Sequence, residues 1–530
     1  MKLNMTRRGF VAVAAILIWL ARATQPGQLI GVARALDPIV YTIKVPAPDT
    51  RFAEVEVSVP TGKRSSIEMM MAVWSPGFYR VEDYAGKIQG LSARTQDGKA
   101  LQVEQPQKNR WRIETGGAPR VIVSYRLLCN SRSVTTNWIG DDLGVMNGAA
   151  TFITLVEQAR RPHEVRLELP PQWKRAMTAL DAANGQPNHF RADDFDTLAD
   201  SPIVAGDLAV REFDVEGSRH YVVDAGAVGQ WDGQRAAQEL EKIVRATHRF
   251  WGFLPFKRYV FLNVFRQGGG GLEHKNSTLL TSSSARSSIP TLGWLGFVSH
   301  EYFHAFNVKR LRPIELGPFD YERPPNTGSL WVSEGLTTYF GELLVARAGI
   351  SRPQDYLASV SSHIRQLQNS PGRLLQTLEQ SSLNVWTSGT SGVGQDNTKT
   401  VSYYVKGPVV GFLLDARIQR LTGGRKSLDD VMRLAYKRYS GARGFTAEQF
   451  RKTAEDVAGA DLKEWFRKAL ASTEELDYNE ALDWYGLRFA TPDEQQPAKK
   501  WNLEIHEGAT ETQKNRLQKL TGQSETRKTP

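Results

Sequence analysis

Two histidines four positions apart, His300 and His304, flank a glutamate at position 301. On a helix, residues at i and i+4 project from one face, so both imidazoles can reach one metal ion, and zinc accepts such nitrogen ligands. Glu301 cannot easily reach the same ion. It is therefore free to take a proton from a water that the metal activates, as the general base of a zinc peptidase does. The spacing predicts one Zn²⁺ ion held by the two histidines, with Glu301 as catalytic base.

The segment around these residues has the composition of a buried helix. Residues 291–310 contain no proline, which favours one continuous helix. A wide apolar side is formed by Leu292, Leu295, Phe297, Val298, Phe303 and Phe306. Two imidazoles and a carboxylate inside such a helix are costly without a partner. We therefore favour a metal site over histidines that are satisfied within a core.

Glu334 is the carboxylate best placed to be the third metal ligand. It lies 30 positions after His304 and opens a helical run over 334–348, and a carboxylate on a rigid helix can be held at ligand distance. The acids between the two share their segment with four prolines, which is typical of a solvated loop; they are Glu315, Asp320 and Glu322. The alternative role for Glu334 is that of a helix N-terminal carboxylate interacting with the macrodipole.

The first 35 residues resemble an export leader. Arg7 and Arg8 precede a modest apolar run over 11–20, which is typical of a twin-arginine signal, and a small-x-small cleavage site ends at Ala35. A second cleavage site ends at Ala23. The apolar run is short for a membrane span, so a retained anchor is the less favoured alternative. We expect a periplasmic bacterial protein without a stable membrane span after signal removal.

Charge and cysteine content restrict the partners. The formal charge of +10 falls to +5 without the leader, which carries five basic residues and no acids. Of this, residues 498–530 hold a net +3, from seven Lys/Arg and four Glu. No basic helix or aromatic-basic alternation supports nucleic-acid binding. Cys129 is the single cysteine, so an intrachain disulfide is excluded, consistent with folding before export.

The periodicity of the chain predicts a multidomain α+β protein. Short alternating apolar runs with Pro, Gly and Asp between them predict a β-sandwich-like N-terminal domain over 36–205. A helix over 230–253 and a following strand introduce an α+β catalytic domain over 206–350, and helical patterns dominate 351–490. Residues 491–530 read as a basic, solvated tail with a short strand over 501–505 and a helix over 510–520. The predicted leader occupies 1–35.

Several runs together resemble the glycyl aminopeptidase family of zinc metallopeptidases, M61. The similarity extends over roughly 38–490 and is carried by Gly269 to His274 (GGGLEH), His300 to Pro313 (HEYFHAFNVKRLRP), Trp331 to Gly335 (WVSEG), Tyr403 to Gly407 (YYVKG), Val73 to Tyr84 and Asn147 to Ala150. The family in turn resembles aminopeptidases with a thermolysin-like catalytic domain. The resemblance thus implies that fold for 206–350.

The resemblance also implies substrate-binding residues. Gly269, Gly270 and Gly271 follow an apolar strand-like run over 259–265, and without side chains they would let a peptide backbone lie along a strand edge. Taken alone, the glycine run would indicate a flexible turn. Glu273 would bind the free α-ammonium group of the substrate, so the site would select chain ends.

Tyr404 occupies the first position of the family's Tyr-x-Lys-Gly run. The resemblance implies that its phenol donates a hydrogen bond to the oxyanion of the tetrahedral intermediate, a role that a neutral donor can fill. Tyr403 is the competing candidate. His274 is not expected to bind the metal, because two helical histidines and one glutamate complete a three-ligand set that leaves zinc an open position.

The implied activity is zinc-dependent release of N-terminal residues from peptides that have a free N-terminus, with a preference for glycine or alanine. Two alternatives stay open: a zinc endopeptidase, and a non-enzymatic periplasmic peptide-binding protein that retains a zinc fold. Many family members continue into a PDZ domain, for which about 40 residues after 490 are too few. The natural substrate and the oligomeric state are not predicted.

Overall fold

The computed structural model describes residues 36–156, 160–226, 231–265, 269–282, 289–388, 392–393, 396–491 and 500–522. The predicted export leader, residues 1–35, lies outside the described residues, so the leader and the localisation stay predictions. Residues 37–530 form one compact unit, and the predicted internal boundaries at 205, 350 and 490 stay predictions as well. No helix among the described residues is long and apolar enough to cross a membrane.

Strands dominate the N-terminal part. They are β1 (Ile39–Lys44), β2 (Phe52–Pro60), β3 (Ser66–Met70), β4 (Ile88–Thr95), β5 (Ala100–Leu101), β6 (Val103–Gln107), β7 (Arg110–Glu114), β8 (Arg120–Leu128), β9 (Trp138–Ile139), β10 (Leu143–Met146), β11 (Thr154–Leu155), β12 (His163–Glu168), β13 (Arg175–Thr178), β14 (Asp181–Ala182), β15 (His189–Ala192) and β16 (Ile203–Gly206). Two short helices, α1 (Gly148–Thr151) and α2 (Phe195–Ala199), lie among them.

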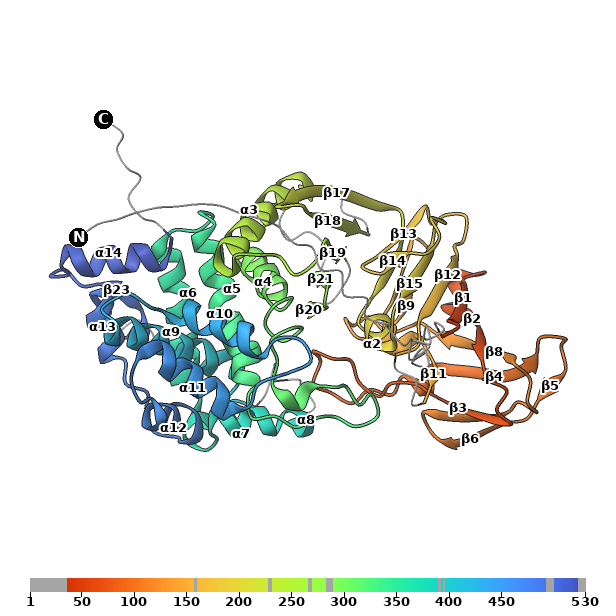
Figure 1. The fold of residues 1–530 in the computed structure, drawn as a ribbon. Helices are drawn as coiled ribbons and strands as arrows, with labels where there is room; N and C mark the ends of the chain where they lie inside the picture. Colours follow the sequence, from red (N-terminus) through yellow and green to blue (C-terminus); the bar gives the residue numbers. More distant parts are fainter. Residues whose placement is uncertain are drawn as a thin grey trace, which may run out of the picture. The chain divides into compact units, whose positions relative to one another are not determined.

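Within the described residues these strands form one eight-stranded and two four-stranded sheets (Figure 1). Their orders are β14-β15-β12-β1-β2-β8-β4-β5, β13-β16-β10-β9 and β11-β3-β7-β6. Strand β2 shows why these residues form a sheet: Ala53, Val55 and Val57 are buried in the core, while Glu54 and Glu56, which alternate with them, are exposed. This period of two places one face of the sheet in the core and the other in water.

The next sheet leads to the site. Its strands are β17 (Leu208–Val215), β18 (Ser218–Ala225), β19 (Arg258–Phe265), β20 (Gly270–Glu273) and β21 (Ser277–Ser282), in the order β17-β18-β19-β21-β20. Every residue of β19 after Arg258 is buried, as expected of a strand covered on both faces. β20 pairs antiparallel with β21 and lies at the edge of the sheet.

Helix α4 (Leu292–Phe303) carries His300, ends directly before His304 and is shorter than the predicted 291–310. Thr291 caps its start by accepting a hydrogen bond from the Trp294 N–H. Beyond Phe303 the guanidinium of Arg310 donates to the Ala305 carbonyl at 2.7 Å, so it satisfies a group that the ended helix leaves free. His304 keeps helical dihedrals (φ −60°, ψ −23°), and the i, i+4 relation therefore survives.

A helix pair forms the floor of the site. A π-helical turn (Trp331–Gly335) runs directly into α5 (Leu336–Arg347), which packs against α4. Gly341 allows this packing, because a Cβ there would lie 2.9 Å from the Cα of His300. The helix predicted over 334–348 is therefore present, and its first residues lie in the π-helical turn.

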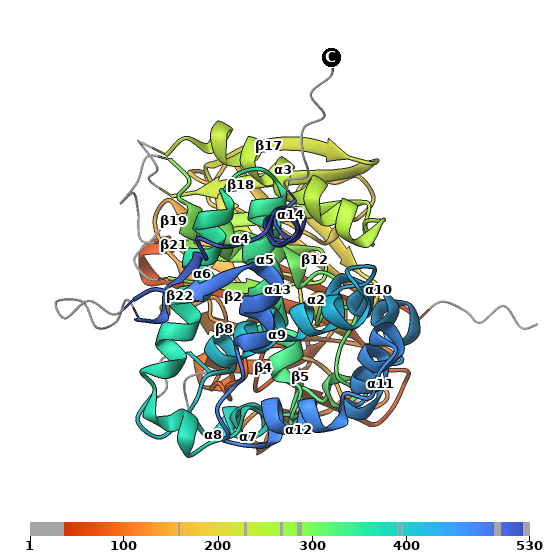
Figure 2. The same ribbon diagram turned by 90° about the vertical axis from the view of Figure 1, so that its left-hand side faces the viewer.

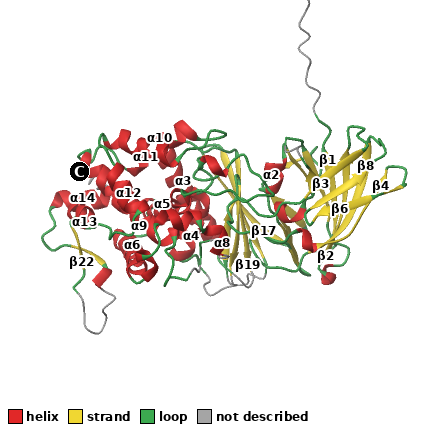
Figure 3. Ribbon diagram, turned by 90° about the horizontal axis from the view of Figure 1, so that it is seen from below, coloured by secondary structure: helices red, strands yellow, loops and turns green. Residues whose placement is uncertain are grey.

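Helices dominate the rest of the chain (Figures 2 and 3). Helix α3 (Gly233–Trp251) lies between β18 and β19 in the sequence. The helices that follow α5 in the chain are α6 (Pro353–Gln368), α7 (Leu378–Leu383), α8 (Val385–Ser388), α9 (Tyr403–Leu421), α10 (Leu428–Tyr439), α11 (Ala447–Ala458), α12 (Lys463–Ala471) and α13 (Asn479–Tyr485). Strands β22 (Leu487–Phe489) and β23 (Leu503–Ile505) and helix α14 (Glu511–Leu520) come last.

In the described residues 500–522 of the basic tail, the predicted short strand and helix are present as β23 and α14, and they are not solvated throughout. β23 pairs antiparallel with β22, and the Leu503 N–H donates to Ser361 on α6 at 2.8 Å. Leu517 and Leu520 on α14 are buried. The physical reason is that these apolar side chains, three positions apart on one helix face, gain more by packing than by remaining in water.

A buried histidine predicts how stability depends on pH. In His220 the Nδ1–H donates to the Ser218 carbonyl and Nε2 accepts from the Tyr302 hydroxyl, both at 2.9 Å. Burial lowers the pKa of His220 from 6.5 to about 4. The unfolded chain therefore binds a proton first, so this contribution to stability is complete above pH 6.5 and is lost as the pH falls through about 4.

The expected loss is about 3 kcal/mol across that window. Urea midpoints measured from pH 7 to pH 4 should fall for the wild type and fall less steeply for His220→Phe. Burial likewise lowers the pKa of His163 to about 4, so His163 contributes to the pH dependence of the urea midpoint in both proteins. An unchanged slope in the variant would show that His220 is not the group that titrates.

Candidate active site

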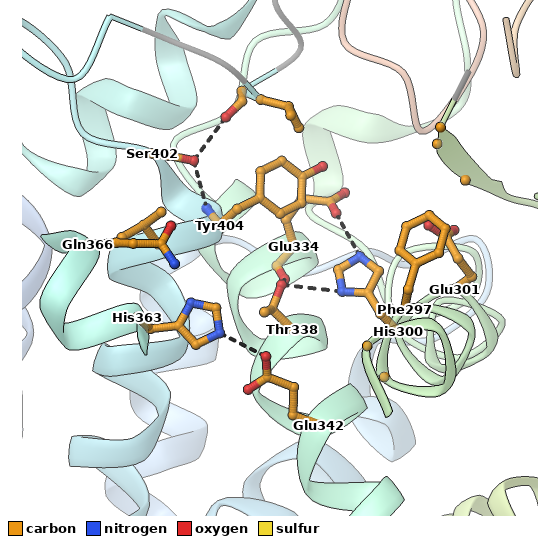
Figure 4. A pocket seen from close by; sticks show the side chains of 18 of the residues that line it. Phe297, His300, Glu301, Glu334, Thr338, Glu342, His363, Gln366, Ser402 and Tyr404 are labelled. Atoms are coloured by element: carbon orange, nitrogen blue, oxygen red, sulfur yellow. Dashed lines mark hydrogen bonds and ion pairs between the residues drawn. The ribbon is translucent and has the colours of Figure 1, made fainter. Parts of the chain in front are cut away.

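The structure brings His300, His304 and Glu334 together, and Figure 4 shows His300 and Glu334 facing one another. The Nε2 atoms of the two histidines lie 2.9 Å apart. Oε2 of Glu334, on the π-helical turn, lies 3.2 Å from Nε2 of His304 and 3.6 Å from Nε2 of His300. Glu334 and His304 are almost completely buried. Their ligand atoms converge on one point from two packed helices.

Hydrogen bonds at the other ring nitrogens define the tautomers. The Nδ1–H of His304 donates to the Asn307 carbonyl at 2.9 Å. The Thr338 hydroxyl donates to the Glu334 carbonyl at 2.9 Å, so it accepts from the Nδ1–H of His300 at 3.2 Å. When both rings are neutral, as metal binding requires, both Nε2 atoms present lone pairs, and together with the Glu334 carboxylate they form three acceptors without a donor. A cation satisfies this set, and its nitrogen and oxygen donors fit zinc.

The electrostatics of the site also favour a cation. Burial alone would lower the pKa of His304, but the carboxylates of Glu334 and Glu273 outweigh burial and raise that pKa to about 9. Burial and the neighbouring His304 lower the pKa of His300. Although burial opposes it, His304 and His300 hold the pKa of Glu334 far below its ordinary value. The site therefore carries negative potential at the point where the ligand atoms meet.

Glu301 lies beside this set. It is 4% exposed, and its Oε2 has no hydrogen-bond partner among the described residues. Burial, together with the charges of Glu273 and Glu334, raises the pKa of Glu301 to about 8 despite the nearby His304. Glu301 also belongs to a second group of ligand atoms with Glu273 and His304. An enclosed carboxylate with a raised pKa and a free oxygen has the properties of a proton acceptor.

The edge strand β20 passes directly over Glu301. A Cβ at Gly271 would lie 2.2 Å from Oε1 of Glu301 and 2.6 Å from the Phe297 ring, so only glycine fits there. Gly269 and Gly270 have no such close contact. Of the three predicted glycines, Gly271 alone is thus required by close approach. The other two leave the edge of the strand uncovered.

Glu273 at the end of β20 is buried, and its Oε1 has no hydrogen-bond partner among the described residues. The nearest cation is the Lys309 ammonium, with Nζ 3.8 Å from that oxygen. Burial raises the pKa of Glu273 although Lys309 opposes the shift. An oxygen in this state is ready to accept a hydrogen bond from a cationic donor.

The sequence pattern did not reveal Lys309 and Asp200 as parts of the site. The Lys309 Nζ donates to Asp200 at 2.9 Å and to the Pro76 carbonyl at 3.1 Å. His274 binds Asp200 through Nδ1 at 3.1 Å and lies outside the three-ligand set. Burial opposes ionisation of Asp200, but Lys309 and His274 lower its pKa to about 2. Lys309 lies in the HEYFHAFNVKRLRP run, the one signal that pointed to it.

A loop after β3 brings Tyr79 into the site, which the sequence also did not reveal. The Tyr79 hydroxyl donates to Oε1 of Glu334 at 3.1 Å. Gly77 in the same loop has φ +101° and lies so close to Glu273 that a Cβ would be 2.2 Å from Oε1. In the sequence, the run from Val73 to Tyr84 stands out only by its resemblance to the M61 family. Its role depends on long-range packing between the N-terminal part and the site.

Tyr404 lines the cleft at the start of α9, and its ring centroid lies 6.2 Å from that of His300. Ser402 caps the helix by accepting from the Tyr404 N–H at 3.1 Å. Tyr403 is fully buried and directs its hydroxyl at Gly392, where a Cβ would be 2.2 Å away. This arrangement favours Tyr404 over Tyr403 as the residue that meets a substrate.

These side chains surround a cleft of about 1380 Å³. All nine predicted site residues line it: Gly269, Gly270, Gly271, Glu273, His300, Glu301, His304, Glu334 and Tyr404. The volume is sufficient for a short peptide. The cleft thus combines an uncovered strand edge, a ligand set for one cation, an enclosed carboxylate base and a phenol.

Family models match two parts of the chain. The M61 N-terminal domain matches residues 40–207, and the M61 glycyl aminopeptidase model matches residues 293–410, which include the ligand set. The chain belongs to peptidase family M61. The predicted resemblance is therefore confirmed, and this M61 protein is a metallopeptidase.

Solved structures agree with the assignment. An aminopeptidase N family protein from Idiomarina loihiensis matches with a TM-score of 0.80 and 28% identity, over 86% of this chain and 80% of that one. An M1 zinc metallopeptidase from Deinococcus radiodurans matches with a TM-score of 0.51 and 14% identity, over 84% of this chain and 95% of that one. The second likeness concerns the fold alone. No curated protein sequence matched. The predicted α+β fold with a thermolysin-like catalytic domain is confirmed for this M61 metallopeptidase.

Proposed function

We propose that this M61 metallopeptidase is a zinc-dependent aminopeptidase that removes small N-terminal residues, glycine or alanine, from peptides. The observation that carries the proposal is the buried, unpartnered oxygen of Glu273 next to the ligand set. A substrate's α-ammonium group would satisfy this oxygen, and an internal peptide segment would not. The family's description as glycyl aminopeptidases supports the preference for small residues.

His300, His304 and Glu334 would hold one zinc ion. When bound, zinc would polarise the scissile carbonyl and lower the pKa of water enough to make it a nucleophile at neutral pH. The three acceptors without a donor support this assignment. Thr338 and Asn307 would fix the orientation of the two imidazoles through Nδ1.

The other residues of the cleft have separate tasks. Glu301 takes up the proton of the attacking water and returns it to the leaving amine. Tyr404 donates a hydrogen bond to the carbonyl oxygen as negative charge develops there. The main chain of β20 aligns the substrate as an additional strand, and Glu273 pairs with its ammonium group.

Tyr79 is expected to strengthen zinc binding by holding the Glu334 carboxylate. Its hydroxyl donates to Oε1, so Tyr79→Phe removes one orienting hydrogen bond and leaves the ring in place. We expect roughly 10- to 100-fold weaker zinc affinity. Competition with a chromogenic chelator measures it. Tyr84→Phe is the matched control, because the Tyr84 hydroxyl bonds Ser75 instead. Equal affinities in the two variants would refute the role of Tyr79.

The function is tested with glycine-, alanine- and leucine-arylamides and an N-acetylated glycine-arylamide as control. We expect release of the chromophore from free amino termini only, fastest for glycine or alanine. Cleavage of the acetylated substrate would favour an endopeptidase. Zinc-loaded protein that cleaves neither the arylamides nor longer peptides would favour a peptide-binding protein.

A further inference from the structure

The cleft continues beyond the ligand set, along the face of α5 that follows Glu334 of the π-helical turn. Thr338 and Glu342 follow Glu334 at intervals of four residues and both line the cleft. At 1.5 Å per residue, Glu342 lies roughly 12 Å from Glu334 along the helix. Helix α6 packs beside α5 and contributes His363 and Gln366 to the same wall (Figure 4). Of these α5 and α6 side chains, Thr338 alone has a role in the steps proposed above.

Glu342 and His363 form a pair in this wall. The Nε2–H of His363 donates to Oε1 of Glu342 at 2.9 Å, because a carboxylate can only accept. Their side chains are 25% and 15% exposed, so the pair is partly removed from water. Nδ1 of His363 is enclosed and has no hydrogen-bond partner among the described residues. In the neutral ring this nitrogen is a second acceptor beside the carboxylate.

The part of this wall beside His363 carries the negative charge of Glu342. Among the described residues, His363 is the one ion-pair partner recorded for Glu342. Arg365 also lines the cleft and keeps its positive charge, but its guanidinium is directed at the Asn502 side chain, to which it donates at 2.8 Å. The wall therefore offers acceptors and a carboxylate to a ligand. Such a surface binds a donor-rich cation and disfavours an anion.

The position of the pair relative to Glu273 indicates which part of a substrate reaches it. Glu273 groups with Glu301 and His304, while Thr338 bonds His300 on the other side of the ligand set. Glu342 lies one helical turn beyond Thr338. A peptide with its ammonium group at Glu273 and its first carbonyl at the ligand set therefore extends its next residue toward Glu342.

We infer that Glu342 and His363 form the subsite for the residue after the scissile bond and select lysine or arginine there. The inference rests on the proposed aminopeptidase function and names its substrate class: peptides with a small first residue and a basic second residue. Gln366 adds an amide to the same wall. A carboxylate at the second position meets like charge and is disfavoured.

The test compares kcat/KM for Ala-Lys-amide, Ala-Leu-amide and Ala-Glu-amide, whose amidated ends remove the terminal carboxylate. We expect the order Lys, Leu, Glu, with at least about tenfold between the first and the last. Glu342→Gln should reduce the ratio of Lys to Leu several-fold. Glu342→Lys should invert the order, which a general loss of folding cannot do.

Glu164→Gln provides the matched control, because Glu164 pairs with His189 at 3.0 Å in the β12 and β15 pair of the N-terminal sheet. It should keep the wild-type order. Hydrolysis without a charge preference, or a lysine preference that survives in Glu342→Lys, would overturn the subsite alone. If none of the three amides nor the arylamides were hydrolysed, the proposed function would be overturned together with it.

Discussion

Glu301→Gln is expected to keep its zinc and to lose hydrolysis by roughly 100- to 10,000-fold, the range in which a general base contributes. Glutamine fills the same space below Gly271, but its amide cannot accept the proton. Glu301 is enclosed, and burial with two neighbouring carboxylates raises its pKa to about 8, so its charged form readily takes up a proton. The predicted effect is therefore on turnover and not on metal binding.

The measurement pairs kcat/KM on alanine-arylamide with the zinc content of the same sample. Glu164→Gln, in the N-terminal sheet, is the control and should retain activity. A Glu301→Gln enzyme that works at nearly the wild-type rate would assign the base to another residue. A variant without zinc would show instead that Glu301 helps to hold the ligand set together.

Removal of zinc by a chelator is expected to abolish hydrolysis and to destabilise the fold. Without zinc, two imidazoles and the Glu334 carboxylate are crowded within 2.9 to 3.6 Å of one another, and a proton on His304 offsets only part of the negative charge of Glu334, Glu273 and Glu301. Zinc at a thousandfold excess over its Kd should stabilise the protein by about 4 kcal/mol. Activity and stability should return together when zinc is added back.

Thermal unfolding and arylamide hydrolysis, recorded before chelation, after it and after zinc addition, check this prediction. Glu334→Ala serves as the comparison and should respond to zinc in neither assay. Full activity of a protein with no measurable metal would contradict the zinc mechanism. Recovery of stability without activity would place the ion elsewhere.

The ligand set was predictable because its geometry is largely local. The spacing of His300 and His304 places both rings on one helix face, and this holds even though α4 ends at Phe303. Glu334 was predictable as the third ligand because it opens a strong helical pattern, whereas the other candidate acids lie in a proline-rich loop. Glu273, Gly271 and Tyr404 depended on the family resemblance, since a glycine turn and an aromatic pair have no chemical meaning by themselves.

Other parts of the site were not predictable from local patterns. Tyr79 and Asp200 approach from the N-terminal part, far from Glu334 and Lys309 in the sequence. Thr338 and His363 look like ordinary helix residues until α5 and α6 pack around the cleft. The described part of the basic tail packs as β23 and α14, because its few apolar residues find partners on α6 and α13.

The sequence by itself determined the chemistry of this protein: the types of ligands, the base between them and the succession of strand-rich and helix-rich parts. Helical and strand periodicity act over a few residues, so they can be read from the chain. Only the tertiary structure decided which distant side chains contact the ligand set and which side chains line the cleft beyond it. Those contacts depend on packing between segments that the sequence separates by up to 255 positions, as Tyr79 and Glu334 show.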